Sequence, residues 1–596
     1  MDVEEFGLDQ AEVGVPDDIN DLIKQIETLG LEWCATSGQM VKIREDQVVN
    51  SAGGYVFKVS DESRVRRFLI LGSSGGSYYS TEKELTLNNV EALMKIISAG
   101  KGAMIVKEIV AISTSGRAPR QDPAIFALAL CVHFSYKLEG VDDSEQLVYT
   151  KYIDSLKKHA MNVLPKVCRI PTHLFKFARY SEMISGQLNK SSGWGRRMRG
   201  AIASWYLTMD PEKLAYQVTK YQCREGWSHR DLLRLSHPRP AKFPEKKDEL
   251  NNIFSYVVKG KRKWLEEGSE DLEGKKSYQL IDNICLLKDY NEYQAAEVAK
   301  LVAEHGLVRE VIPSNFLNSP EVWKAMLPKM PLTALIRNLG KISSIGLTDE
   351  GTGDQVVANI VDKLTNQENL HKAMIHPVQI LFALVTYQNS KGYRGSLQWK
   401  KNPKIMEALN KAFDLSFKNV QKTGKRICLA LDVSGSMTQN IMNSCMTCRE
   451  ASCAMSAVFL RTEDHVESVG FSEKLIELKF MTKTASIEQM SDKMNGIQFG
   501  QTDCSLPMIW AAKKKKEFDA FIVFTDNETY YGDVHPFEAM KQYRKKSGIK
   551  DAKLIVCGMV ANDFTIADPT DAGMLDVVGF DAAVPNIVND FITGTL

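Results

Sequence analysis

The sequence predicts a protein of two parts: a long all-helical region and, after it, an α/β domain built on a mainly parallel sheet. Between residues 55 and 415, apolar residues recur at helical spacing, as in Val90, Leu93, Met94 and Ile97. Near residue 420 the pattern changes to short apolar runs with longer helical patterns between them, which is typical of doubly wound α/β domains. A chain of 596 residues has room for about two to four domains.

Residues 55–415 are expected to form a HEAT-like helical-repeat region. Amphipathic segments of roughly 10–16 residues follow one another, separated by short polar turns, and stacked helices of this kind build solenoids. No exact repeat is visible, so an irregular helical domain is the alternative. Residues 1–54 are acidic at the start and contain one amphipathic segment, at 19–31. We therefore expect an N-terminal extension with a single helix.

Residues 416–596 are expected to form the α/β domain. Nearly continuous runs of isoleucine, valine, leucine and phenylalanine are typical of strands that are buried on both faces of a parallel sheet. Four such runs occur, at residues 426–431, 466–471, 520–525 and 553–557. Turn or polar residues follow each run, and ligands of open α/β sheets bind beyond the carboxyl ends of the strands.

Composition excludes several classes of protein. Lysine and arginine number 75 and aspartate and glutamate 74, so the net charge indicates no particular partner. The N-terminus is acidic and lacks the apolar region of a signal peptide. The longest apolar stretch, at 124–134, is far shorter than the roughly 18 residues of a membrane span. The 11 scattered cysteines indicate reduced thiols, so we expect a soluble cytoplasmic protein with a nuclear fraction.

Hydroxyl and carboxylate residues gather at the expected strand ends. Asp432, Ser434 and Ser436 directly follow the first strand, Asp526 follows the third, and Thr502 lies in a loop between them. These hard oxygen donors, together with waters, suit Mg²⁺. The alternative is that the serines only cap the following helix.

The Asp-x-Ser-x-Ser pattern, with the threonine and the aspartate in two later loops, resembles the metal-ion-dependent adhesion site of von Willebrand factor A domains. The resemblance implies that the five residues hold a divalent metal, which we expect to be Mg²⁺, and leave one position for a partner carboxylate. Asp503 is an additional candidate beside the threonine. Serine hydrolysis is disfavoured, because residues 433–436 do not read Gly-x-Ser-x-Gly and no histidine follows at a triad position. We therefore expect a binding module and not an enzyme.

A local surplus of positive charge lies in the helical region. Residues 161–240 contain 14 basic and 5 acidic residues, whereas residues 421–596 contain 19 and 23. If the segment around 220 is helical, Lys220 and Arg224 share a helix face, and Arg230 and Arg234 repeat that spacing. Cations at such spacing follow phosphates, and interleaved aromatic residues stack on unpaired bases. The alternative is a solvated basic face that covers a buried Trp227.

Four strings of the sequence resemble signatures of the TROVE-domain family of Ro ribonucleoproteins. They are Val-Cys-Arg-Ile-Pro-Thr-His-Leu-Phe at 167–175, Trp-Ser-His with Asp-Leu-Leu-Arg-Leu-Ser-His between 227 and 237, Pro-Leu-Thr-Ala-Leu with Arg-Asn-Leu-Gly between 331 and 340, and Gly-Gln-Thr-Asp-Cys-Ser-Leu-Pro-Met-Ile-Trp at 500–510. The resemblance extends from about residue 55 to the C-terminus. Residues 1–54 exceed the short N-terminal tail of the family.

This second resemblance implies a closed ring of HEAT-like helices whose ends are joined by the A domain. Members of the family bind small noncoding Y RNAs on a basic outer surface and single-stranded 3′ ends of misfolded small RNAs in a central hole. They act in RNA quality control and ribonucleoprotein assembly. The family positions that contact Y RNA fall on Lys220, Arg224 and His237, and we add Arg196 and Arg197 because of their charge. A ring formed by one chain implies a monomer.

Two alternatives from other classes remain. In the first, the chain is a protein-interaction scaffold whose metal-bearing A domain recruits acidic protein ligands, and the basic face is incidental. In the second, it is a metal-dependent nuclease that uses Asp432 and Asp526. One metal with hydroxyl ligands and no paired carboxylate cluster disfavours the nuclease. We expect neither DNA nor a membrane as a partner.

Overall fold

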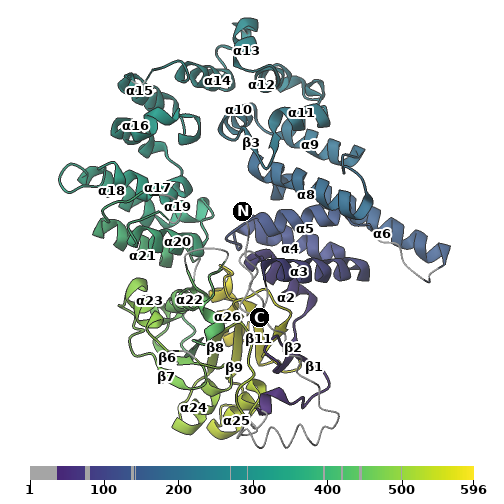
Figure 1. Ribbon diagram of the computed structural model, residues 1–596, viewed down its shortest axis with the longest axis vertical. Coiled ribbons are helices and arrows are strands. Elements are labelled where there is room, and N and C mark those ends of the chain that lie inside the picture. Colours follow the sequence, from purple (N-terminus) through teal and green to yellow (C-terminus); the bar gives the residue numbers. More distant parts are fainter. Residues whose placement is uncertain are drawn as a thin grey trace, which may run out of the picture.

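The computed structural model describes residues 37–595 apart from 74–80, 136–139, 141, 269, 292, 393–395, 418–419, 442–445 and 499. The helix expected at 19–31 lies outside the described residues. The chain has the two predicted parts, an arch of helices and an α/β domain that lies against both ends of the arch (Figure 1). None of the described helices is long and apolar enough to cross a lipid bilayer.

The helical region runs from α2 to α21, which confirms the prediction of an all-helical first part. Successive helices pack side by side around the arch (Figure 1). The first half contains α2 (Asp61–Leu71), α3 (Glu82–Ile96), α4 (Gly102–Ser115), α5 (Asp122–His133), α6 (Asp143–Asn162), α7 (Leu164–Val167), α8 (Pro171–Asn189), α9 (Arg196–Thr208), α10 (Pro211–Lys220) and α11 (His229–Ser236). The second half contains α12 (Lys247–Lys259), α13 (Lys261–Glu267), α14 (Lys276–Leu287), α15 (Ala295–His305), α16 (Pro320–Met326), α17 (Leu332–Ser344), α18 (Asp354–Thr365), α19 (Gln367–Lys372), α20 (Pro377–Gln388) and α21 (Pro403–Leu415).

Local sequence determines where many of these helices begin. Thr81 with Glu84 forms a reciprocal capping box before α3, and Ser228 with Asp231 forms one before α11. These side chains supply acceptors to N–H groups that have no partner within the helix. Proline occupies the first turn of α5, α8, α10, α16, α20 and α21, where its missing N–H removes no helical hydrogen bond.

The α/β domain is built on a six-stranded sheet with the order β11-β9-β8-β5-β6-β7, in which only β7 is antiparallel. The four predicted runs are β5 (Arg426–Asp432), β6 (His465–Phe471), β8 (Ala520–Thr525) and β9 (Lys553–Gly558). The edge strands β7 (Leu475–Glu477) and β11 (Met574–Val578) were not predicted, because neither is a continuous apolar run. The helices are α22 (Cys448–Thr462), α23 (Ile487–Asn495), α24 (Leu506–Lys514), α25 (Pro536–Ser547) and α26 (Val584–Thr593).

Both faces of this sheet are covered, as expected for a doubly wound domain. Along β5, Ile427 and Leu429 belong to the apolar cluster that contains α22, whereas Cys428 and Ala430 belong to the one that contains α24 and α25. The first cluster also includes the cores of the helices from α2 to α21. The α/β domain therefore shares one of its cores with the arch.

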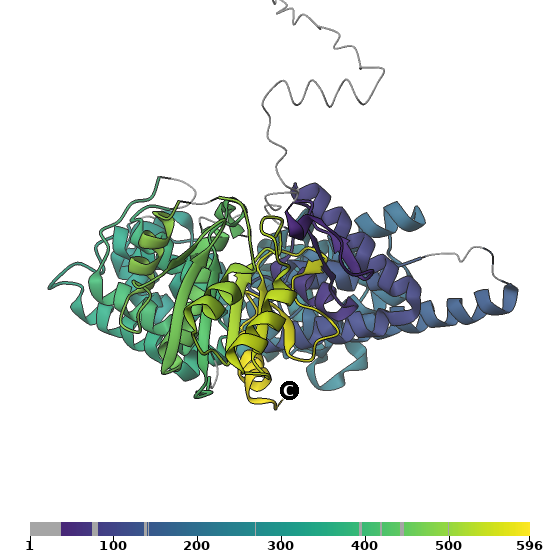
Figure 2. The same cartoon turned by 90° about the horizontal axis from the view of Figure 1, so that it is seen from below.

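A segment near the N-terminus, residues 37–58, packs on the α/β domain. Its strands β1 (Gln47–Val49) and β2 (Tyr55–Lys58) form a separate sheet with β10 (Phe564–Thr565). Figure 2 shows this purple segment beside the yellow C-terminal part of the chain. The boundary at residue 55 therefore falls within a sheet that joins the two ends of the sequence, a pairing that no local pattern indicates.

The two ends of the arch meet at a buried junction with the α/β domain. The Arg117 guanidinium, in the turn after α4, donates from Nε to both carboxylate oxygens of Asp581 at 2.9 and 3.0 Å. The Arg117 carbonyl accepts a hydrogen bond from His376 Nε2 at 2.8 Å, at the start of α20. Gln379 Nε2 donates to the Pro119 carbonyl at 2.7 Å. Three segments far apart in the sequence thus close the helical path.

The charges at this junction are fixed by burial and pairing. Burial lowers the pKa of His376 to about 4, so the ring is neutral near pH 7. Its Nδ1 accepts from the Val378 N–H at 3.1 Å, which leaves the ring proton on Nε2, where it is donated to Arg117. Burial also disfavours the Arg117 charge, but the hydrogen bonds and charge of Asp581 outweigh it and raise the pKa of Arg117.

Replacing Arg117 with alanine is expected to lower the free energy of unfolding by about 3–5 kcal/mol, because Asp581 would stay buried without its cation. The matched control is Arg120→Ala, since the Arg120 guanidinium has no hydrogen-bond or ion-pair partner among the described residues. Urea unfolding followed by circular dichroism measures both variants. Equal midpoints would show that the junction does not stabilise the closed arch.

Candidate functional site

The basic residues singled out in the sequence lie on consecutive elements of the arch, from α9 to the end of α11. Lys220 is the last residue of α10, and Arg224 belongs to β3 (Cys223–Arg224), which pairs with β4 (Trp227–Ser228). The prediction that Lys220 and Arg224 share a helix face is therefore wrong. The helix ends at Lys220, and Glu225 and Gly226, both with positive φ (56° and 80°), turn the chain into a short hairpin.

Arg230 and Arg234 do lie on a helix, α11, as their spacing predicts. Leu232 and Leu233 of this helix are buried, while both arginines are exposed. His237 follows α11 directly, is exposed, and has a left-handed backbone with φ 44°. The hairpin is held against the arch by the contact of the Trp227 and Trp194 rings, whose centroids are 5.3 Å apart.

The five predicted RNA contacts differ in how firmly the protein holds them. The ammonium group of Lys220 lies over the rings of Tyr216 and Tyr221 and 3.9 Å from Glu310 Oε1. Burial works to lower the pKa of Lys220, but these neighbours outweigh it and the pKa is raised. The group is therefore a fixed cation whose side chain is only 10% exposed.

The three arginines among these five residues, Arg196, Arg197 and Arg224, are exposed. Arg197 forms a two-hydrogen-bond ion pair with Asp154, at 2.7 and 2.6 Å. Arg196 and Arg224 have no ion-pair partner among the described residues. An incoming phosphate can therefore bind these two guanidinium groups without displacing a carboxylate, whereas at Arg197 it has to compete with Asp154.

Four of the five predicted metal ligands form one buried cluster at the carboxyl ends of β5 and β8. Asp432 Oδ1 accepts from the Ser434 N–H at 2.9 Å, and the Ser434 and Ser436 hydroxyls are 3.2 Å apart. The Ser436 hydroxyl is hydrogen-bonded to Asp526. No group of three or more His, Cys, Asp or Glu side chains in the described residues is arranged to hold a metal, so hydroxyl oxygens would have to complete the ligands here.

Thr502 lies in the neighbouring loop and is buried. Its carbonyl accepts the N–H groups of Tyr530 and Tyr531 at 3.1 and 3.0 Å, which ties this loop to the one that follows β8. The carboxylate of Asp503, in contrast, accepts from Gln39 and Ser505 at 2.7 and 2.6 Å. Asp503 therefore anchors the N-terminal segment to the loop.

Two buried carboxylates of this cluster, Asp432 and Asp526, hinder each other's ionisation, while the charge of Arg449 favours the ionised form of Asp432. Burial raises the pKa of Asp526 to about 7, and the nearby charge of Asp432 adds to the shift. Burial also raises the pKa of Asp432, against the effect of its hydrogen bonds. Two acids that hinder each other's ionisation form a place where a divalent cation gains attraction from both.

Glu528 is a further acid of this region that the sequence interpretation missed. It is 3% exposed, and burial together with the charge of Asp526 raises its pKa to about 8. The Ala52 N–H donates to Glu528 Oε2 at 3.1 Å, so the N-terminal segment covers it. The sequence does contain a signal for this acid, because Glu528 follows the predicted metal ligand Asp526 by two residues. Its burial could not be predicted, because Ala52, which covers it, lies 476 positions earlier in the sequence.

Comparison with known proteins agrees with this two-part architecture. The TROVE domain profile matches residues 48–384, and the Ro60 vWA domain profile matches residues 426–592. The RNA-binding protein RO60 of Caenorhabditis elegans is 44% identical over 94% of this chain and 92% of its own. The protein of the same name from Deinococcus radiodurans is 35% identical over 93% and 97%.

A solved structure is similar as well. The crystal structure of the Deinococcus radiodurans RO (RSR) protein superposes with a TM-score of 0.63 at 34% identity, covering 90% of this chain and 100% of that one. The matched regions include both the arch and the α/β domain. The chain belongs to the Ro60 family of RNA-binding proteins, in which a TROVE domain is followed by a von Willebrand factor A domain.

Proposed function

We propose that this Ro60-family protein binds small noncoding RNAs of the Y type on the surface formed by α9, β3 and α11, and that it is not an enzyme. The observation that carries the proposal is the set of exposed arginines on these elements that have no ion-pair partner among the described residues, namely Arg196, Arg224, Arg230 and Arg234. Unpaired cations on neighbouring elements attract phosphates without first losing a protein partner. Lys220 and His237 border the same elements.

The second part of the proposal is that the protein also binds single-stranded 3′ ends of misfolded small RNAs. The closed path of the helices supports it, because a strand on the inner side of the arch would be surrounded by protein. The protein would then hold structured and single-stranded parts of one RNA at different places. This division suits a role in RNA quality control and ribonucleoprotein assembly.

A Lys220→Ala, Arg224→Ala double variant is expected to bind a structured small RNA about ten- to hundredfold more weakly than the native chain at low salt. The magnitude of the slope of log K against log salt should decrease by about two, because each lost phosphate contact reduces that slope by about one. Fluorescence anisotropy across a salt titration measures both quantities. The control, Lys404→Ala with Lys411→Ala on α21, should match the native chain. Equal binding by all three proteins would contradict the proposed surface.

We also propose a metal site in the A domain, formed by Asp432, Ser434, Ser436, Thr502 and Asp526, with Mg²⁺ as the metal. The mutual repulsion of the two buried aspartates supports it, because a cation would remove that repulsion. When bound, the metal would offer a coordination position to a carboxylate of a protein partner. The scaffold alternative depends on this site, whereas the nuclease alternative predicts that the metal-loaded protein cleaves RNA.

Adding Mg²⁺ to the metal-free protein is expected to raise the melting temperature of the native chain by several degrees, since saturating ligand adds about 2.7 kcal/mol at a hundred times its dissociation constant. The Asp526→Asn variant should not respond. Without metal this variant should be at least as stable as the native chain, because it lacks the repulsion between the aspartates. Differential scanning calorimetry in EDTA and in Mg²⁺ measures both effects. An equal Mg²⁺ response in both proteins would contradict the site.

A further inference from the structure

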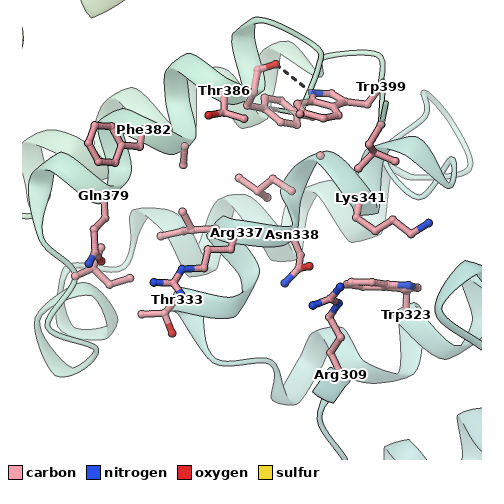
Figure 3. A pocket seen from close by; sticks show the side chains of 18 of the residues that line it. Arg309, Trp323, Thr333, Arg337, Asn338, Lys341, Gln379, Phe382, Thr386 and Trp399 are labelled. Atoms are coloured by element: carbon pink, nitrogen blue, oxygen red, sulfur yellow. Dashed lines mark hydrogen bonds between the residues drawn. The ribbon is translucent and has the colours of Figure 1, made fainter. Parts of the chain in front are cut away.

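A cavity of about 600 Å³ between α17 and α20 collects cations from both halves of the arch (Figure 3). Arg120, Arg309 and Arg337 line it. Trp399 packs on Gly340 in its wall, where a Cβ atom would come within 2.7 Å of the indole. These cations suit the single-stranded RNA ends of the proposed function. A second surplus of positive charge, on the A domain, has no such explanation.

This second surplus lies where α24 and α25 end, at the end of the A domain that lies away from the arch (Figure 1). The Tyr543 hydroxyl of α25 accepts from the Phe518 N–H at 2.5 Å and donates to the Lys516 carbonyl at 3.1 Å. The last turn of α25 therefore lies against the turn after α24. Six exposed lysines on these helix ends and the adjoining loops form what we term the lysine surface, namely Lys513, Lys514, Lys515, Lys545, Lys546 and Lys550.

The lysine surface lacks counter-charges. None of its six side chains has a hydrogen-bond or ion-pair partner among the described residues. Two nearby acids are already paired, Glu517 with Arg426 at 2.5 Å and Glu467 with Lys516 at 2.9 Å. Asp551 is exposed without a cation partner in the described part of the chain, and it offsets one of the six charges. Like charges gathered in this way repel one another, so an anionic partner would stabilise them.

The residues that precede the described part of the chain carry the opposite charge. Residues 1–36 contain 10 acidic residues and one lysine, whereas the rest of the chain contains 64 acidic and 74 basic residues. The near neutrality of the whole chain therefore depends on these 36 residues.

The chain enters the described structure close to the start of α25. Ser37 Oγ donates to the Gly532 carbonyl at 2.5 Å. Gln39 Nε2 donates to the Val534 carbonyl at 2.9 Å, and α25 begins two residues later, at Pro536. The 12 residues of α25 span about 18 Å, which about six extended residues can cover. The acidic residues before Ser37 can therefore reach the lysine surface.

The lysine surface offers charge but no ring faces on which bases could stack. Phe518 is buried, and Trp510 stacks on it with ring centroids 6.1 Å apart. Proteins that bind unpaired RNA normally combine cations with accessible aromatic rings. A segment of carboxylates needs only the cations, so the chemistry of this surface favours an acidic peptide over RNA.

We propose that the acidic segment of residues 1–36 binds the lysine surface of the same chain. A tethered ligand has an effective concentration on the order of millimolar, which gives this segment an advantage over free polyanions. The bound segment would shield the A domain from RNA and leave the arginines of the arch as the exposed cations. The proposal depends on neither RNA binding nor the metal site.

Zero-length crosslinking of the full-length protein with a water-soluble carbodiimide tests the proposal, because the reagent joins a carboxylate directly to a lysine amine. At low salt, residues 1–36 should crosslink to the lysine surface about tenfold more often than to other exposed lysines, for which Lys324, Lys404 and Lys411 serve as the reference. Sodium chloride at about 0.5 M should remove most of this preference by screening. Mixing unlabelled and ¹⁵N-labelled protein identifies crosslinks between two chains.

A charge-reversal variant provides an independent readout. Trypsin can cleave residues 1–36 only after Lys24, the single basic residue there. Changing Lys514, Lys515 and Lys546 to glutamate should accelerate this cleavage about fivefold or more, because cleavage follows the population of the released segment. The matched control reverses three exposed lysines elsewhere and should be cleaved like the native chain; it carries Lys324→Glu, Lys404→Glu and Lys411→Glu.

Two results would overturn the proposal. One is a crosslink pattern that is even over the exposed lysines or concentrated on the arch. The other is equal cleavage after Lys24 in all three proteins. Crosslinks that join labelled to unlabelled chains would assign the segment to a second copy and so contradict binding within one chain. Thermal unfolding checks that all variants are folded.

Discussion

The closed arrangement of this protein depends on the buried contact between Arg117, His376 and Asp581. The three residues come from three different segments. The turn after α4 supplies the Arg117 guanidinium, which binds the Asp581 carboxylate of the α/β domain, and the Arg117 carbonyl, which accepts the ring N–H of His376 at the start of α20. A helical solenoid is held together mainly by contacts between neighbouring repeats, so its two ends are otherwise independent. The junction joins both ends to a third element, and it places Arg120 opposite Arg309 and Arg337 in one cavity.

The fold class could be predicted from the sequence because it leaves local signals. Helical periodicity marked the arch, and four continuous apolar runs marked the central strands of the sheet. The junction left no such signal, because Arg117, His376 and Asp581 are separated by more than 200 residues and nothing in their neighbourhoods requires a partner. The same reason explains why β1, β2 and β10 were missed, since each is too short to produce a pattern without the others.

The candidate sites show the same division between local and distant information. Four of the five predicted metal ligands end or directly follow β5 or β8, so the clustering of these four side chains could be predicted from the topology of a parallel sheet. The four-residue spacing of Lys220 and Arg224 predicts a shared helix face, but Gly226, a turn signal, follows closely and the chain forms a hairpin after Lys220. The cavity next to α17 was not foreseen at all. Its cations come from both halves of the arch, and its aromatic wall depends on Trp399 packing against Gly340.

The two parts of the chain offer opposite electrostatic environments. The arch presents exposed arginines that lack carboxylate partners, whereas the A domain buries Asp432, Asp526 and Glu528 close together. This difference supports the proposal that RNA binds the arch. The proposed metal ion would lie at the strand ends of the A domain, where it would neutralise buried acids. Separate ligands can thus occupy one chain without competing for the same groups.

Hydrogen–deuterium exchange of the full-length protein, with and without a saturating structured small RNA, tests most directly whether the arch binds RNA. RNA is expected to slow exchange in peptides that cover residues 196–237 and to leave exchange in the sheet of the A domain unchanged. Protection confined to residues 426–592, with none in α9 to α11, would contradict the claim that the arch is the RNA-binding part of the molecule.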